Sequence, residues 1–144
     1  MSRTNNFSEL VQAAIAVREN AHAPYSGYLV GAALMDDRGK MHVGCNVENA
    51  SFPEGTCAES GAIAAMVASG GKRIAAIACV GGRDELEACT PCGGCRQRIH
   101  EFADADTRVV LMNADGAYFD GTVADLLPAG FRLEPQQQAD GAQS

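Results

Sequence analysis

The segment "RIAAIACVGG", residues 73–82, is a continuous apolar run of strand length. Strands that are apolar on both alternating faces are typical of sheets that are covered on both sides. The sequence therefore predicts a buried strand here, with helices packed against each face of its sheet.

The segments on either side of this run predict an alternation of helices and strands. Hydrophobic periodicity predicts helices at residues 7–20, 57–69, 92–103 and 122–128, and further strands at residues 28–35, 40–47 and 108–113. Strands that alternate with helices after an initial hairpin imply a mixed sheet between two layers of helices. The predicted fold class is a three-layer α/β domain.

The domain organisation follows from the length and from the distribution of polar residues. A chain of 144 residues, of which 47% are hydrophobic, is long enough to bury one hydrophobic core but too short to form two domains of typical size. No repeat or linker interrupts residues 1–133, so we expect a single domain there. The polar residues 134–144 are expected to form a disordered tail.

Charge and hydropathy limit the partners that we expect. The formal net charge of −7 disfavours nonspecific nucleic-acid binding, which depends on Lys and Arg releasing counterions. No segment approaches the roughly 18 consecutive apolar residues of a membrane span, and the first residues lack the apolar core of a signal peptide. We therefore expect a cytoplasmic protein with no nucleic-acid partner and no membrane partner.

Three of the six cysteines stand at predicted helix starts. In a reducing compartment, cysteines are metal ligands, redox groups or buried thiols more often than disulfides. Cys92 and Cys95 form a Cys-x-x-Cys pair at one helix start, where free N–H groups and the helix dipole favour thiolates, and Cys57 stands at another. If the two helix starts converge, three thiolates meet, and three protein ligands with an open fourth position are the pattern of a catalytic zinc site.

Glu59 is the candidate proton shuttle for such a site. Zinc with an open position lowers the pKa of a bound water to about 7, and a proton acceptor must then stand beside it. Glu59 lies two residues after Cys57, and side chains at this separation do not share a helix face. Glu59 is therefore badly placed to bind the same ion and better placed to reach the water.

The motif Cys-Ala-Glu at residues 57–59, with Pro-Cys-x-x-Cys-Arg-Gln at residues 91–97, resembles the small three-cysteine cytidine deaminases of the homotetrameric type. Residues 23–34, 44–51 and 126–131 also resemble family segments, in the family's order. The resemblance implies an α/β/α sandwich with a mixed five-stranded sheet. It also implies zinc-dependent hydrolysis of cytidine or deoxycytidine to uridine or deoxyuridine and ammonia, a reaction of pyrimidine salvage.

The resemblance assigns the metal and the chemistry to four residues. Cys57, Cys92 and Cys95 would hold one zinc ion per chain, and Glu59 would shuttle protons. In the wider class of zinc deaminases, the zinc hydroxide attacks C4 of cytosine while a Glu that does not bind the metal acts as general acid and base.

The resemblance also implies how a nucleoside substrate is held. Asn46 and Glu48 match the pair that binds the ribose hydroxyls, which suits an amide that donates and accepts beside a carboxylate that accepts. Ala58 is a further substrate contact, Tyr28 stands where the family usually stacks a Phe near the base, and Phe131 matches an aromatic that a tetramer lends to a neighbouring subunit. The alternatives are a solvated strand edge for the polar pair and core positions for the two aromatic rings.

Ser60 departs from the family pattern. The family generally has an Arg at this position, and that Arg and the one after the last cysteine offset the charge of a zinc tris-thiolate. Zinc with three thiolates carries a formal charge of −1, and here Arg96 alone is evidently at hand. The hydroxyl of Ser60 can compensate only weakly, by a hydrogen bond to a sulfur. Metal affinity and substrate identity are therefore left open.

The remaining candidate ligands have ordinary interpretations. Cys79 lies within an apolar strand and is expected in the core, and Cys45 and Cys89 are expected to be small filler residues. Of the histidines, only His100 has a ligand-like spacing, five residues after Cys95. An exposed position on the helix is the preferred interpretation of His100.

Three other functions fit parts of the pattern. A thiol–disulfide oxidoreductase would explain the Cys-x-x-Cys pair but not Cys57 or Glu59. A noncatalytic zinc module would need a fourth protein ligand. Within the deaminase interpretation, the alternative is an aminohydrolase that acts on a modified cytosine nucleoside or a cytosine-containing antibiotic, for which Ser60 and Tyr28 leave room.

Overall fold

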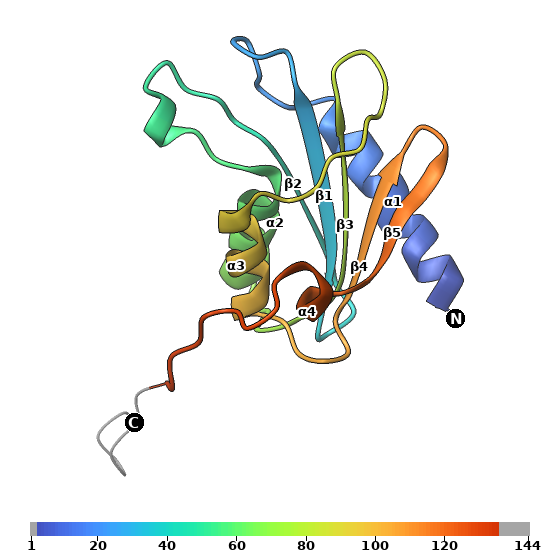
Figure 1. Ribbon diagram of the computed structural model, residues 1–144, viewed down its shortest axis with the longest axis vertical. Coiled ribbons are helices and arrows are strands. Elements are labelled where there is room, and N and C mark those ends of the chain that lie inside the picture. Colours follow the sequence, from blue (N-terminus) through green and yellow to red (C-terminus); the bar gives the residue numbers. More distant parts are fainter. Residues whose placement is uncertain (1–2, 136–144) are drawn as a thin grey trace.

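The computed structural model describes residues 3–135, which form five strands and four α-helices (Figure 1). In chain order the elements are α1 (Arg3–Arg18), β1 (Leu29–Asp36), β2 (Met41–Cys45), the 3-10 helix η1 (Phe52–Glu54), α2 (Ala58–Ala68), β3 (Ile74–Gly82), α3 (Gly93–Glu101), β4 (Arg108–Asn113), β5 (Gly116–Thr122) and α4 (Val123–Leu126).

The strands form one mixed sheet with the order β2-β1-β3-β4-β5. Strand β1 is antiparallel to both of its neighbours, β3 and β4 are parallel, and β5 is antiparallel to β4. Consequently β2, β3 and β4 all run in the same direction. The mixed five-stranded sheet that the resemblance implied is confirmed.

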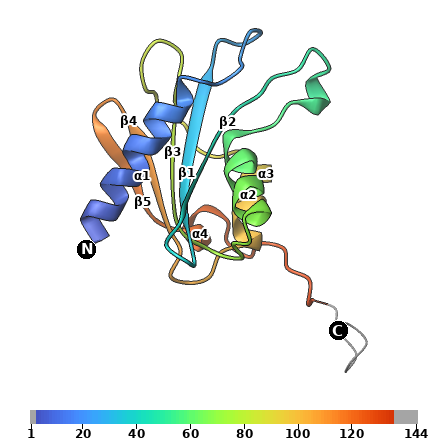
Figure 2. The ribbon, with the colours of Figure 1, turned by 180° about the vertical axis from the view of Figure 1, so that it is seen from behind.

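Strand β3 is the middle strand, and its side chains alternate between two hydrophobic clusters. Ile77 and Cys79 pack in the cluster that includes α2 and α3, whereas Ala78 and Val80 pack in the cluster that includes α1. Helix α1 therefore covers one face of the sheet, and α2, α3 and α4 lie on the other (Figures 1 and 2). This confirms the three-layer architecture that the apolar run at residues 73–82 predicts.

Two glycines let the helices approach the sheet closely. A Cβ at Gly31 on β1 would collide with the carbonyl oxygen of Ala14 on α1. A Cβ at Gly44 on β2 would likewise collide with the carbonyl oxygen of Ala58 and the amide nitrogen of Ala62. Van der Waals overlap with backbone atoms cannot be relieved by a rotamer change. These two glycines therefore determine how closely each helix layer packs on the sheet.

The direction of the strands explains why two helix starts meet. Helix α2 connects β2 to β3, and α3 connects β3 to β4. Since these three strands are parallel, both helices begin at the same end of the sheet, and they pack beside each other. The carboxyl ends of parallel strands are where α/β proteins place their binding sites.

The structure differs from the sequence-based expectations mainly at the ends of elements. Helix α1 begins at Arg3, earlier than the expected residue 7, and α4 is a single turn. Strand β5 was implied by the family resemblance but not by the residue pattern. Among residues 3–135, no helix is long and apolar enough to cross a membrane. Most of the expected tail, residues 136–144, lies outside the described residues.

Candidate metal centre and substrate pocket

Two of the candidate ligands are the N-cap residues of the two converging helices. Cys57 caps α2 with φ −83° and ψ 158°, and Cys92 caps α3 with φ −66° and ψ 168°. An extended N-cap residue leaves its side chain beside the free N–H groups of the first turn. Cys95 lies in the first turn of α3, so all three sulfurs are near helix N-termini.

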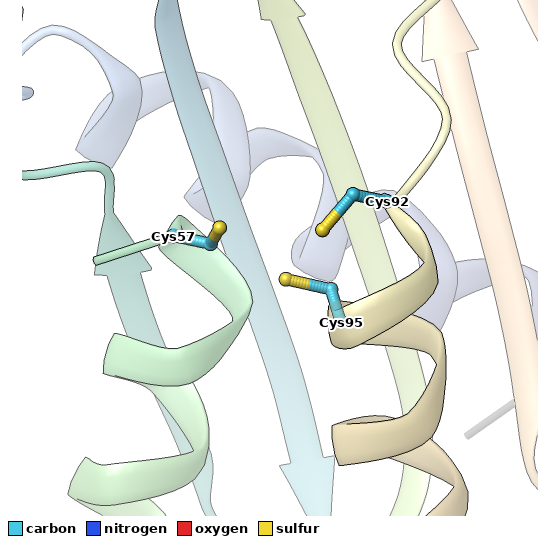
Figure 3. A group of neighbouring side chains, drawn as sticks. All are labelled: Cys57, Cys92 and Cys95. Atoms are coloured by element: carbon cyan, nitrogen blue, oxygen red, sulfur yellow. The ribbon is translucent and has the colours of Figure 1, made fainter. Parts of the chain in front are cut away.

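The three sulfur atoms face one another across the gap between α2 and α3 (Figure 3). They all lie within 4.8 Å of one another, and all three cysteines are free thiols. Tetrahedral zinc with Zn–S bonds of about 2.3 Å holds its sulfur ligands about 3.8 Å apart, so small side-chain movements complete the set. Within residues 3–135, the group contains no fourth His, Cys, Asp or Glu ligand. The cluster fits a three-cysteine zinc site.

The protonation of the three thiols depends on burial and on backbone donors. Burial raises the pKa of Cys57 and of Cys95, whereas the backbone N–H of Cys95 lowers the pKa of Cys92. Two of the thiols are thus held neutral by their surroundings. A divalent cation reverses this because a coordinating thiol is deprotonated outright.

Glu59 is a buried carboxylate beside this cluster. It lies in the first turn of α2 and is only 4% exposed. Among the described residues its carboxylate forms no ion pair. Its hydrogen-bond partner is the thiol of Cys95. A buried carboxylate without a counter-charge is costly, and a cation at the neighbouring sulfurs would offset that cost.

A cavity of about 580 Å³ opens in front of the cluster. Its size lies within the range of sites for small molecules, about 300–1,000 Å³. Six of the residues predicted for the site line it: Asn46, Glu48, Cys57, Ala58, Glu59 and Cys92. The cavity therefore has a thiol end with a carboxylate and, in the segment that follows β2, an amide with a second carboxylate.

The two ends of the cavity are held together by the backbone. Val47 and Thr56 exchange two hydrogen bonds, of 3.0 and 2.9 Å, and so close the loop between them. Because Thr56 directly precedes Cys57 and Val47 lies between Asn46 and Glu48, this pairing brings the polar pair to the metal ligands.

Asn46 and Glu48 are fixed by hydrogen bonds to the start of β1 and to the loop before it. The Asn46 side chain accepts from the Val30 N–H at 2.8 Å and donates to the Tyr28 carbonyl oxygen at 2.8 Å. The Glu48 carboxylate accepts from the hydroxyl and the N–H of Ser26 and from the Tyr25 N–H. The Ser26 hydroxyl is the main reason why the pKa of Glu48 lies below its usual value.

The two predicted aromatic contacts lie outside the lining of this cavity. Tyr28 has its ring against the guanidinium of Arg83, 5.5 Å from the ring centroid, and burial raises the pKa of its hydroxyl. Phe131 is 64% exposed. Its backbone is held by Gln97, which donates to the Phe131 carbonyl oxygen at 2.8 Å and accepts from the Phe131 N–H at 3.2 Å.

The residues predicted to balance the charge also lie beside the cavity rather than in it. Arg96 donates to the carbonyl oxygens of Pro91 and Leu126, each at 2.8 Å. Ser60 lines a separate groove between α2 and α3 together with Arg98. Arg98, which the sequence analysis did not select, donates to the sulfur of Cys95 at 3.7 Å. Its position three residues after Cys95 on a helix is the pattern that could have identified it.

The other candidate residues have mixed outcomes. Cys79 is buried in β3, as predicted. Cys89 was expected to be a small filler residue, but it lines the cavity. His100 is only partly exposed, because it packs against Gly130, where a Cβ would lie 2.7 Å from its ring. His100 does not belong to the thiol cluster.

Comparisons with known proteins agree with this geometry. Residues 4–112 match the family model of the cytidine and deoxycytidylate deaminase zinc-binding region. A cytidine deaminase of Halalkalibacterium halodurans is 42% identical over 125 residues, which cover 87% of this chain and 93% of the relative.

Solved structures show the same similarity. The crystal structure of a cytidine deaminase from Burkholderia pseudomallei has a TM-score of 0.79 and 42% identity, and the match covers 91% of this chain and 100% of that one. The cytidine deaminase from Mycobacterium tuberculosis has a TM-score of 0.76 and 34% identity, over 89% and 98% of the two chains.

Fold and site together define a zinc-binding α/β domain. The chain belongs to the cytidine and deoxycytidylate deaminase family, whose zinc-binding region extends from α1 to β4.

Proposed function

We propose that this protein is a zinc-dependent cytidine deaminase, which hydrolyses cytidine or deoxycytidine to uridine or deoxyuridine and ammonia. The observation that carries this proposal is the single cavity that Cys57, Cys92 and Glu59 share with Asn46 and Glu48. It combines a metal cluster and a buried carboxylate with polar groups suited to a sugar.

The thiol end of the cavity carries the chemistry. Cys57, Cys92 and Cys95 hold one zinc ion, which when bound supplies a Lewis acid and an activated water. Glu59 is buried and beside the cluster, so its carboxylate can accept a proton at the thiol end of the cavity and return it to the leaving amine. The near-complete burial of Glu59 also excludes competing water from this carboxylate.

The other end of the cavity holds the sugar. The bonds from Ser26 and Tyr25 orient the Glu48 carboxylate and favour its ionised form, which accepts hydrogen bonds from hydroxyl groups. Asn46 uses one of its two N–H donors and one oxygen lone pair within the chain, so one of each remains for a ligand. Ala58, without a long side chain, leaves room for the base between the two ends.

We also propose a homotetramer in which Phe131 completes the pocket of a neighbouring subunit. The exposure of the Phe131 ring and its fixed backbone support this proposal, because aromatic side chains are enriched at protein interfaces and the ring is free to contact a second chain. Tyr28 is proposed to act near the base, at the edge of the same pocket next to Cys89.

A cytoplasmic location and a role in pyrimidine salvage belong to the same proposal. All six cysteines are free, although Cys57, Cys92 and Cys95 are close enough to compete for disulfide formation. Free thiols at such a cluster suit a reducing compartment.

The deaminase explains features that the other functions leave aside. A thiol–disulfide oxidoreductase would not explain why Cys57 and Glu59 lie beside the Cys-x-x-Cys pair. A structural zinc module would not explain the cavity next to the metal ligands. An aminohydrolase acting on a modified cytosine compound remains the second candidate. Ser60, in place of the family's usual arginine, is the observation that favours it.

Ammonia release by the purified protein tests the proposal. Cytidine and deoxycytidine are expected to be deaminated, and free cytosine, which cannot engage Asn46 and Glu48, is expected to be a poor substrate. Adenosine serves as the control with the same ribose and a different base. Activity on a modified cytosine compound without activity on cytidine would select the second candidate, and absence of ammonia from all these compounds would contradict both.

A further inference from the structure

We infer that Arg98 balances the charge of the zinc thiolates in this chain, a role that rests on the zinc enzyme proposed above. Arg98 acts through Cys95 and does not touch the cavity, so it is a positioning residue rather than a catalytic one.

The site needs a cation close to the sulfur atoms. Zinc with three thiolates has a formal charge of −1, and the carboxylate of Glu59 adds a second negative charge nearby. Cys95 is fully buried and Glu59 nearly so. Uncompensated charge is costly where water is excluded, so a neighbouring cation stabilises the metal-bound form.

Arg98 reaches one of the sulfurs directly. Its Nη1 lies 3.7 Å from the Sγ of Cys95, at an (i, i+3) spacing on one face of α3. The same nitrogen would lie 3.4 Å from a Cβ on Gly94, which is ordinary van der Waals contact and places the guanidinium over the first turn of α3. A hydrogen bond from a cation reduces the charge that a thiolate donates to its metal.

The other candidates are less suitable. Arg96 directs its guanidinium to the carbonyl oxygens of Pro91 and Leu126 and thereby ties the start of α3 to α4. Ser60 carries no charge, and it lines the same groove between α2 and α3 as Arg98. The cation therefore approaches the thiolates from α3, across the groove from the position where this chain has Ser60.

The test compares Arg98→Gln with the wild-type protein by two measurements on the metal. Transfer of zinc to a chromophoric chelator is expected to show an affinity lower by about 10- to 100-fold, the usual effect of removing a partner of a metal ligand. In cobalt-substituted protein, the sulfur-to-cobalt charge-transfer band is expected to move to lower energy, because an uncompensated thiolate donates more charge.

Three further variants separate charge balance from a general structural role. Arg73→Gln removes an exposed arginine that pairs with Asp104 and is the matched control, expected to leave both measurements unchanged. Arg98→Lys retains the charge and is expected to restore part of the affinity. Ser60→Arg combined with Arg98→Gln returns a cation to the shared groove from α2 and is expected to restore the affinity and the band position.

The outcomes distinguish this inference from the proposed function. Wild-type protein that binds no zinc would overturn both. Wild-type protein that binds zinc, with the affinity and the cobalt band unchanged in Arg98→Gln, would overturn the inference and leave the proposed function intact. An equal loss of zinc affinity in Arg98→Gln and in the double variant would also count against the inference. If Arg98 acts through its charge, the Ser60→Arg substitution should restore the affinity.

Discussion

Gly44 on β2 packs directly against the backbone of Ala58 at the start of α2, so closely that a Cβ on Gly44 would overlap the Ala58 carbonyl oxygen. Ala58 lies between Cys57 and Glu59, which supply a predicted metal ligand and the predicted proton shuttle. The contact between Gly44 and the start of α2 therefore determines the distance between the sheet and the residues of the site.

Gly44→Ala is expected to destabilise the protein by about 1–3 kcal/mol, the usual cost of overpacking, and to lower zinc affinity by displacing the first turn of α2. Urea unfolding and zinc titration measure the two effects. Gly93→Ala is the control for stability, since no atom lies within 4 Å of its new Cβ. If Gly44→Ala unfolds at the wild-type urea concentration, the close packing does not constrain the site.

The three cysteines of the cluster are expected to contribute equally to metal retention. Replacing Cys57, Cys92 or Cys95 singly by Ala leaves two protein ligands, too few for a stable zinc site. Elemental analysis after dialysis should show one zinc per chain in the wild type and a large loss in each variant. Cys45→Ala, outside the cluster, is expected to retain its zinc. A cluster variant with full zinc content would remove that residue from the ligand set.

Glu59→Gln is expected to retain zinc and fold but to lose most of its turnover. Gln has nearly the same shape as Glu but cannot take up and release a proton, and general acid–base catalysis is typically worth about 10²- to 10⁴-fold. Steady-state kinetics with cytidine, together with zinc analysis, measure both properties. Glu54→Gln, at the exposed end of η1, is the matched control. Retention of a tenth of the wild-type turnover would exclude the proposed role.

The central layer and the thiol cluster could be predicted from the sequence because each follows from a local pattern. The run at residues 73–82 is apolar on both faces, which only a covered strand requires. Cys57, Cys92 and Cys95 stand at helix starts, and parallel strands bring such starts to one end of a sheet. Patterns of this kind depend only on residues that are close in the sequence, so they can be recognised without knowing the tertiary contacts.

The parts that could not be predicted depend on contacts between distant segments. Strand β5 has two glycines and half-exposed side chains at the edge of the sheet, so it has no clear apolar alternation. The partners of Arg96 include Leu126, which is 30 residues away along the chain. The anchoring of Glu48 by Ser26 likewise requires the loop before β1 to fold back on the end of β2.

Asp36 at the end of β1 is expected to make stability depend on pH. Its carboxylate is buried, which raises its pKa, but hydrogen bonds from His42 and Arg38 outweigh burial and hold the pKa below its usual value. A depressed native pKa contributes stability that is present above the unfolded value of about 3.9 and is lost as the pH falls toward the native value.

Comparison of the wild type with Asp36→Asn at each pH isolates this contribution. At pH 7 the variant is expected to unfold at a lower urea concentration, since it lacks the charge that His42 and Arg38 surround. Between pH 5 and 3 the difference in the free energy of unfolding should shrink, because only the wild type loses the contribution. Asp115→Asn, on an exposed turn, is the control. A difference that stays constant with pH would mean that the Asp36 charge does not stabilise the fold.

Phe131→Ala is expected to raise the KM for cytidine more than it lowers kcat, and to leave zinc content unchanged. The Phe131 ring lies outside the cavity of its own chain and is 64% exposed, while Gln97 holds its backbone in place. A ring that stacks on substrate in a neighbouring subunit contributes to binding rather than to proton transfer. Leu133→Ala, at a residue that is 76% exposed two positions further along, is the matched control.

Mixed tetramers decide whether Phe131 acts in a neighbour. Glu59→Gln and Phe131→Ala chains, each defective alone, are unfolded together and refolded as hybrids. In a hybrid, a Phe131→Ala chain retains its own Glu59 and receives the aromatic ring from a Glu59→Gln neighbour, so its site is complete. The low KM of the wild type should then reappear in part of the sites. If hybrids show only the KM of the Phe131→Ala protein, or if sedimentation finds a fully active monomer, the ring does not serve a neighbouring subunit.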